Sequence, residues 1–256
     1  MGRWSRRLAP LLVTFTGIRE GDSVLDVGSG TGALAFTIAE SFASVRVTGV
    51  DASAAYVRHA EAHHRSDRVR FLEANARSLP LSDAAFDAAA SLLALNFVPD
   101  PSSAVREMRR VTRTGGAVAA AVWDYGEGME MLRVFWDAAV GLDPAADARD
   151  ERHMPLSRQG ELGALWRAAG LDSVDEKPLV IEQTFESFDD FWSPFLGAQG
   201  PAGAYAVSRS PDERGALEAR LRTRLVRDEG DGAFTLRARA WAVRGVVPHL
   251  VTAYVD

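Results

Sequence analysis

The stretch Ser23-Val24-Leu25-Asp26-Val27-Gly28-Ser29-Gly30-Thr31-Gly32 decides the fold of this chain. Its first five residues have the pattern of a short apolar strand, and residues 33–42 have the pattern of a helix. A glycine loop set between a strand and a helix lets backbone N–H groups and the helix N-terminus approach a ligand closely. The stretch therefore predicts a cofactor-binding loop in an α/β fold.

The segments around this loop continue the alternation of strand and helix. Apolar runs of strand length alternate with helical patterns as far as residue 123, which indicates parallel strands joined by crossover helices. An amphipathic helix precedes the loop, ends at Gly17 and contains Pro10, which we expect to kink or restart it. The expected helices are 4–15, 33–42, 54–64 and 103–113, and the expected strands are 23–27, 45–50, 69–72, 86–91 and 117–123.

The second half of the chain begins with the same alternation of helices and strands and then departs from it. Helices are expected at 129–140 and 158–169, followed by a long strand at 174–185. Residues 187–230 are rich in aromatic residues, Gly and Pro before an amphipathic helix, which predicts an inserted helical cap. Residues 234–247 alternate apolar and polar side chains and are expected to pair antiparallel with the strand at 174–185.

The expected fold is a Rossmann-like α/β domain with a seven-stranded, mostly parallel sheet, an antiparallel last strand and helices on both faces. Residues 1–186 and 231–256 are expected to form this domain. Residues 187–230 are expected to form the helical cap, inserted before the last strand.

Composition narrows the classes of partner. The chain has 256 residues and a net charge of -6, so no overall basic field attracts nucleic acid or an anionic membrane. The absence of cysteine removes disulfides, thiolate zinc sites and a cysteine nucleophile. His59 and His63 have metal-ligand spacing on one helix, but no third ligand is near them, and no metal is expected. With neither a signal region nor a long apolar run, a cytoplasmic location is expected, with the oligomeric state open.

The glycine loop by itself fits two classes of cofactor. Gly28, Gly30 and Ala33 satisfy the dinucleotide fingerprint, which favours a nicotinamide or flavin enzyme. Asp26 favours S-adenosylmethionine instead, because a carboxylate under the loop suits a ligand ammonium group and repels a pyrophosphate. Asp51 ends the second strand about 20 residues after Gly28 and can accept hydrogen bonds from ribose hydroxyls, which both classes of cofactor contain.

Further motifs in the same order bring out a family resemblance. The chain resembles the class I S-adenosylmethionine-dependent methyltransferases, in particular the small-molecule, type 11 subfamily that includes the ubiquinone-biosynthesis C-methyltransferases. Besides the glycine loop, the motifs that carry the resemblance are Gly49-Val50-Asp51-Ala52-Ser53, Asn75-Ala76-Arg77-Ser78-Leu79-Pro80, Phe86-Asp87-Ala88-Ala89-Ala90-Ser91, Leu95-Asn96-Phe97-Val98-Pro99-Asp100 and Gly115-Gly116.

This resemblance implies roles for individual residues in binding S-adenosylmethionine. The family usually has an acidic residue at the position of Asn75, to accept from the adenine amino group. The Asn75 oxygen is expected to accept the same hydrogen bond as a neutral group. The resemblance assigns the methionine moiety to the loop with Gly28, Ser29, Gly30 and Gly32, the ribose to Asp51, the adenine edge to Ala52 and Ser53, the adenine ring to Asn75 and Ala76, and the methionyl end to Ser91 and Leu92.

The acceptor of the methyl group is not identified by these motifs. We expect a small, partly apolar molecule that attacks by in-line displacement, which needs alignment and exclusion of water rather than a protein nucleophile. If the acceptor needs a general base, the candidates are Asp124, Tyr125, Glu127 and His153. Aromatic residues that follow the fifth strand are expected to be partly core and partly the wall of an acceptor pocket: Trp123, Phe135, Trp136, Trp192, Phe195 and Tyr205.

Two alternatives remain at this point. A nicotinamide-dependent oxidoreductase is favoured by Gly28, Gly30 and Ala33 and disfavoured by Asp26 and Gly32. A non-catalytic cofactor-binding protein of the same fold is disfavoured by the intact loop and Asp51, and only turnover with an acceptor could exclude it.

Overall fold

The computed structural model describes residues 2–63, 66–226 and 232–249. The chain divides into two compact units, each formed by segments that are separate in the sequence. We call Met1–Val122, Arg158–Leu179 and Ala240–Asp256 the sheet unit, and Trp123–Ser157 with Val180–Arg239 the helical unit. The long strands near the C-terminus have residues in both units.

The sheet has seven strands in the order β3-β2-β1-β4-β5-β7-β6. The first five of these run parallel, with Val24 of β1 opposite Val47 of β2 on one side and Ala88 of β4 on the other. The strands are β1 Ser23–Val27, β2 Arg46–Asp51, β3 Val69–Glu73, β4 Phe86–Leu92, β5 Thr112–Trp123, β6 Asp172–Phe185 and β7 Phe234–Val246.

The last strand runs antiparallel to β5. The amide of Gly115 donates to the carbonyl of Val247 (2.9 Å), while near the other end of β5 the amide of Asp124 donates to the carbonyl of Arg239 (2.9 Å). Residues later in β5 therefore pair with residues earlier in β7, which defines an antiparallel pair. The expected seven-stranded, mostly parallel sheet with an antiparallel last strand is therefore confirmed.

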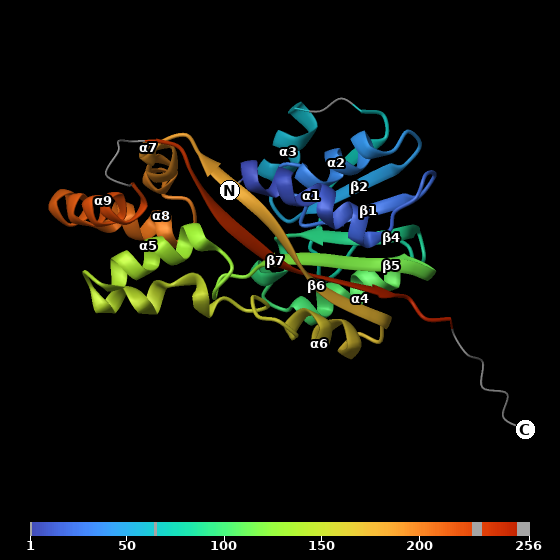
Figure 1. Ribbon diagram of the computed structural model, residues 1–256. Helices are drawn as coiled ribbons and strands as arrows, with labels where there is room; N and C mark the ends of the chain where they lie inside the picture. The colour runs from blue at the N-terminus through green and yellow to red at the C-terminus, as the bar shows by residue number, and fades with distance from the viewer. Residues whose placement is uncertain (1, 64–65, 227–231, 250–256) are drawn as a thin grey trace, which may run out of the picture. The chain divides into compact units, whose positions relative to one another are not determined.

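Helices cover both faces of the sheet unit. Helices α1 Gly2–Thr16, α2 Ala33–Ser41 and α3 Ala54–His63 lie on one side of the sheet, and α4 Pro101–Val111 and α6 Glu161–Ala168 lie on the other (Figure 1). Burial on both faces explains the nearly continuous apolar sequences of the central strands. The indole N–H of Trp166 donates to the carbonyl of Val118 (2.9 Å) and so attaches α6 to β5.

The first helix runs through Pro10 without interruption, so the restart considered from the sequence does not occur. Proline removes one backbone N–H and leaves the carbonyl of Arg6 without its helical donor. Both Pro10 and Arg6 are exposed, so water can hydrate that carbonyl. The opposite side of the helix stabilises it, because Leu8 and Leu12 are fully buried.

The helical unit is larger than the 187–230 insertion expected from the sequence, because residues 123–157, 180–186 and 231–239 belong to it as well. The physical reason is the packing of aromatic rings: the Phe135 ring lies 4.6 Å from that of Phe195 between centroids, and the Trp136 ring 5.5 Å from that of Tyr205. The elements are α5 Glu130–Val140, the 3-10 helices η2 Pro144–Arg149, η3 Glu151–His153 and η4 Ser193–Gly197, and helices α7 Phe188–Trp192, α8 Gly200–Ser208 and α9 Pro211–Leu225.

Two further observations concern membranes and metals. Among the described residues, no helix combines the length and apolar character needed to cross a membrane. The rings of His59 and His63 stack at 4.0 Å on the exposed side of α3, and Nδ1 of His63 faces the carbonyl of His59. Within the same described ranges, no three His, Cys, Asp or Glu side chains are grouped as metal ligands.

Candidate functional site

The glycine loop after β1 is held in one shape by the end of β2. The amides of Gly28 and Ser29 both donate to the carbonyl of Val50, at 2.8 and 2.9 Å. Gly28 has a φ of 74°, and a Cβ there would lie 2.3 Å from the Cβ of Ala94, so only glycine fits. These contacts hold the loop against the end of β2. The loop then leads directly into the N-terminus of α2, where backbone amides can approach a ligand.

Asp51 ties the same loop to the end of β2. Its Oδ2 accepts from the amide of Gly30 (2.8 Å), and its Oδ1 accepts from the amide of Ser53 (2.8 Å). A carboxylate has about four acceptor positions, so these two bonds leave room for two ribose hydroxyls. Asp51 therefore shapes the loop and can also bind a nucleoside sugar.

Asp26 lies beneath the loop and is almost fully buried, with 1% of its surface exposed. Its Oδ2 accepts from the amide of Ala35 (3.1 Å), but its Oδ1 has no hydrogen-bond partner. Burial raises the pKa of Asp26 to about 7; the Ala35 amide opposes this rise, and the negative charge of Asp51 adds to it. An ammonium group at Oδ1 would supply both the missing donor and the missing counter-charge.

Serine hydroxyls complete the polar groups around the loop. The hydroxyl of Ser91, fully buried at the end of β4, donates to the carbonyl of Val27 (2.7 Å) and so joins β4 to β1. Ser29, in the loop itself, is also buried, and its Oγ has no partner. Leu92 is buried next to Ser91.

Asn75 differs from what its sequence position suggested. The residue is exposed, and its Oδ1 accepts from the amide of Arg77 (3.0 Å) and from Nε of Arg77 (3.4 Å). An amide oxygen has two acceptor positions, and both are engaged here. In this conformation the oxygen of Asn75 has no free acceptor position for the adenine amino group.

Strand register brings the residues assigned to the cofactor to one edge of the sheet. Val27 lies opposite Val50, and Asp51 lies opposite Glu73, so the carboxyl ends of β1, β2 and β3 are side by side. This edge, next to the crossing from β1 to β4, is where ligands bind in open parallel sheets. The sequence therefore located a site that the fold brings together, although each residue's role in binding stays a prediction.

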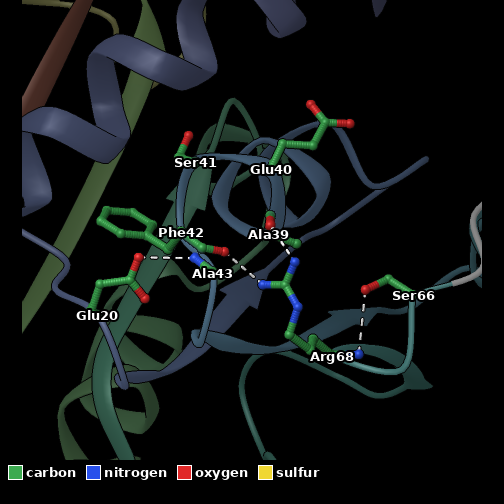
Figure 2. A pocket seen from close by; sticks show the side chains of 8 residues that line it. All are labelled: Glu20, Ala39, Glu40, Ser41, Phe42, Ala43, Ser66 and Arg68. Carbon is green, nitrogen blue, oxygen red and sulfur yellow. Dashed lines mark hydrogen bonds between the residues drawn. The ribbon is translucent and has the colours of Figure 1, made fainter.

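A cavity of about 460 Å³ lies elsewhere on the sheet unit (Figure 2). Its lining comes from segments that precede β1, β2 and β3, so it opens at the amino ends of the strands, opposite the glycine loop. Nη2 of Arg68 donates to the carbonyl of Ala39 (2.8 Å) and Nη1 to that of Phe42 (2.7 Å), while Glu20 accepts from the amide of Ala43 (2.9 Å). These polar groups cap the end of α2, which is a structural role.

The candidate general bases all lie in the helical unit, and the structure places them differently. Asp124 is buried and accepts from Nε and Nη2 of Arg239 at 2.8 and 2.5 Å and from the amide of Glu127 at 2.9 Å, so its carboxylate holds a turn. Tyr125 is buried as well. His153 is exposed, with its Nε2 3.6 Å from Asp147, and the Glu127 side chain is 88% exposed.

The aromatic residues expected to be partly core and partly pocket wall pack against one another. Phe135 is fully buried at the centre of the helical unit, with its ring 5.3 Å from Trp136 and 6.3 Å from Tyr205 between centroids. Trp192 and Phe195 are also buried and contact the same ring. Rings that fill each other's contact surface form a core, so these residues have the core role, and a wall of an acceptor pocket stays a prediction.

One buried titratable residue was missed from the sequence. Glu151 lies in η3, and its Oε2 accepts from the indole N–H of Trp136 (2.5 Å). Burial raises its pKa to about 7; the Trp136 hydrogen bond opposes the rise, and the charge of neighbouring Asp150 adds to it. Nothing in the local sequence marks this glutamate, because its burial depends on the packing of α5 and α8 around it.

Comparison with known proteins agrees with this geometry. Residues 25–120 match the family model described as a methyltransferase domain. An uncharacterized protein of Mycobacterium tuberculosis is 34% identical over 216 residues, which is 82% of this chain and 78% of that protein. The ubiquinone/menaquinone biosynthesis C-methyltransferase of Bdellovibrio bacteriovorus is 36% identical over 118 residues, 45% of this chain and 49% of that enzyme.

A solved structure supports the fold over nearly the whole chain. The YcgJ protein of Bacillus subtilis has a TM-score of 0.63 and 20% identity, covering 95% of this chain and 99% of that one. Together with the glycine loop and Asp51, these similarities identify the class of protein. Residues 25–120 belong to this methyltransferase-domain family, and the similarities support a class I S-adenosylmethionine-dependent methyltransferase.

Proposed function

We propose that this protein transfers the methyl group of S-adenosylmethionine to a small, partly apolar acceptor. The observation that carries the proposal is Asp26: a buried carboxyl with an unpartnered Oδ1 beneath a preformed glycine loop. Such a group destabilises the empty protein unless a ligand donor reaches it. The α-ammonium group of an amino acid is a donor of that kind, whereas a dinucleotide brings a pyrophosphate that this carboxyl would repel.

Each part of the site has a role in this proposal. S-adenosylmethionine supplies a methyl group already activated on a sulfonium. The glycine loop and Asp26 would bind its amino-acid end, Asp51 its ribose, and Asn75 with Ala76 its adenine. By fixing both ends of the molecule, these residues orient the methyl group for in-line attack, in which the acceptor atom bonds to the carbon as the carbon–sulfur bond breaks.

The identity of the acceptor is left open by this chemistry. An already activated methyl group needs no protein nucleophile, so an acceptor that is itself nucleophilic requires only positioning and exclusion of water. The carboxylate of Asp124 is engaged by Arg239, which leaves it poorly suited as a general base. A small molecule, rather than nucleic acid or a membrane surface, remains the proposed partner.

Ligand binding to the full-length chain tests the donor. S-adenosylhomocysteine should raise the melting temperature of the protein, while NAD and NADP should leave it unchanged. Asp51→Asn should lose this stabilisation, and Asp67→Asn, which changes an exposed aspartate in the same way, should keep it. Stabilisation by a dinucleotide alone would contradict the proposal and support the oxidoreductase alternative.

Turnover distinguishes an enzyme from a binding protein of the same fold. We expect the purified protein, given S-adenosylmethionine and a set of small phenol, carboxyl and amine acceptors, to release S-adenosylhomocysteine with at least one acceptor. Binding of the cofactor without turnover across such a set would favour the non-catalytic alternative.

A further inference from the structure

Asn96 is a buried amide without a partner. It lies in the 3-10 helix η1, Leu95–Phe97, directly after β4, and is 5% exposed. Neither its Nδ2 nor its Oδ1 makes a hydrogen bond. A buried amide with donors and acceptor all unsatisfied costs stability, so its presence needs an explanation other than folding.

The position of Asn96 links it to the glycine loop. Two residues before it, Ala94 packs on Gly28 so closely that a Cβ on Gly28 would lie 2.3 Å from the Ala94 Cβ. Two residues of chain span at most about 7 Å, so Asn96 stays close to that contact. Its 3-10 turn is held by the amide of Phe97, which donates to the carbonyl of Ala94 (3.0 Å).

Three residues with buried, unpartnered polar atoms thus lie on the two segments that meet at the Ala94–Gly28 contact. Oδ1 of Asp26 and Oγ of Ser29 are buried and unpartnered, and both belong to the stretch that Ala94 contacts through Gly28. The three groups have different hydrogen-bonding capacities. The Asp26 carboxylate accepts hydrogen bonds, the Ser29 hydroxyl can donate or accept one, and the Asn96 amide donates through Nδ2 and accepts through Oδ1. Together they can accept hydrogen bonds from an ammonium group and donate to a carboxylate.

We propose that Asn96 binds the amino-acid end of the cofactor, completing with Asp26 and Ser29 a site for a zwitterionic α-amino acid. This inference rests on the proposed function, since it assigns a binding residue within the same cofactor site. It also accounts for the tolerance of an unsatisfied amide in the core, because the ligand supplies the missing partners.

Two ligands that differ only at that end give a direct test. S-adenosylhomocysteine carries the amino-acid group, whereas 5′-methylthioadenosine carries the same nucleoside thioether without it. Titration calorimetry on the full-length chain should show that Asn96→Leu weakens S-adenosylhomocysteine binding about tenfold, the loss of one hydrogen bond to a charged group. Binding of 5′-methylthioadenosine should stay within about twofold.

Control variants distinguish a specific binding role of Asn96 from a general loss of structure or of cofactor binding. Asp51→Asn should weaken both ligands, because both contain the ribose. Gln183→Leu removes another buried amide without a partner, on β6 in the helical unit, and should leave the ratio of the two affinities unchanged. Asn96→Ala repeats the test if the leucine variant does not fold, and folded Asn96→Leu without ligand should melt no lower than wild type.

The outcomes are distinct. Selective loss of S-adenosylhomocysteine affinity in the Asn96 variants supports the assignment. Equal loss for both ligands, or no loss, overturns it while leaving the proposed function intact. Failure of the wild-type protein to bind either ligand contradicts the proposed function and this inference together.

Discussion

Both units of the molecule bury a carboxyl group whose pKa is raised to about 7, Asp26 in the sheet unit and Glu151 in the helical unit. Their hydrogen bonding differs. Glu151 accepts from the indole of Trp136 and from the backbone of Ala202, so it joins α5, η3 and α8. Asp26 accepts one amide hydrogen bond and leaves Oδ1 without a partner. Buried carboxyls therefore have a structural role in the helical unit and, in the sheet unit, the binding role that we propose.

Replacing the carboxyl of the sheet unit should have the largest effect. Asp26→Asn removes the charge that would pair with the ligand ammonium group but keeps the size of the side chain. Affinity for S-adenosylhomocysteine should fall about 100-fold, the upper range for a charge-assisted hydrogen bond. Titration calorimetry measures the change, and Glu151→Gln serves as the matched control. Retained affinity in Asp26→Asn would remove the distinction between the two carboxyls.

Replacing the carboxyl of the helical unit should change stability rather than binding. A raised carboxyl pKa means that the folded state holds its proton longer than the unfolded state, so stability is lost as pH rises from about 4.5 to about 7. Glutamine does not ionise and avoids this loss. Relative to wild type, the free energy of unfolding of Glu151→Gln should improve by about 2.5 kcal/mol between pH 5 and pH 8.

Urea unfolding at the two pH values measures this difference. Glu73→Gln, which alters an exposed glutamate, should show a much smaller change. A difference between Glu151→Gln and wild type that is the same at both pH values would show that the Glu151 pKa is not raised in the folded protein.

The affinity for the cofactor should itself depend on pH. The empty protein holds Asp26 largely protonated below its pKa of about 7, whereas an ammonium ligand binds the carboxylate. Affinity for S-adenosylhomocysteine should therefore fall about tenfold from pH 8 to pH 6, with a proton released on binding at pH 6. Calorimetry in buffers of different ionisation enthalpy detects that proton. Asp26→Asn should abolish the dependence, and its persistence in that variant would point to another group.

The smallest effect is expected at the adenine end. The oxygen of Asn75 is occupied by Arg77, but a carboxylate there could accept from Arg77 and from the adenine amino group together. Asn75→Asp should tighten S-adenosylhomocysteine binding about threefold, and Asn75→Ala should not. Weaker binding by the aspartate variant would mean that the NH₂ group of Asn75 faces the ligand.

The sequence was most informative where neighbours along the chain determine the structure. The loop from Asp26 to Gly32, the acid at Asp51 and the alternation of strands and helices follow from local patterns, since parallel strands bring their carboxyl ends to one edge whatever their packing. The sequence was less informative in the second half. Asp124 was a candidate base, but its carboxylate is held by Arg239, a residue distant in the sequence.

By itself, then, the sequence determined the α/β fold, the cofactor loop and the family, because strand period, helix period and glycine positions are properties of short segments. Only the tertiary structure decided which polar groups are left without partners. Burial of Glu151, Asn96 and Asp26 depends on elements far apart in the chain, and their hydrogen bonds are completed, or left without a partner, when those elements pack.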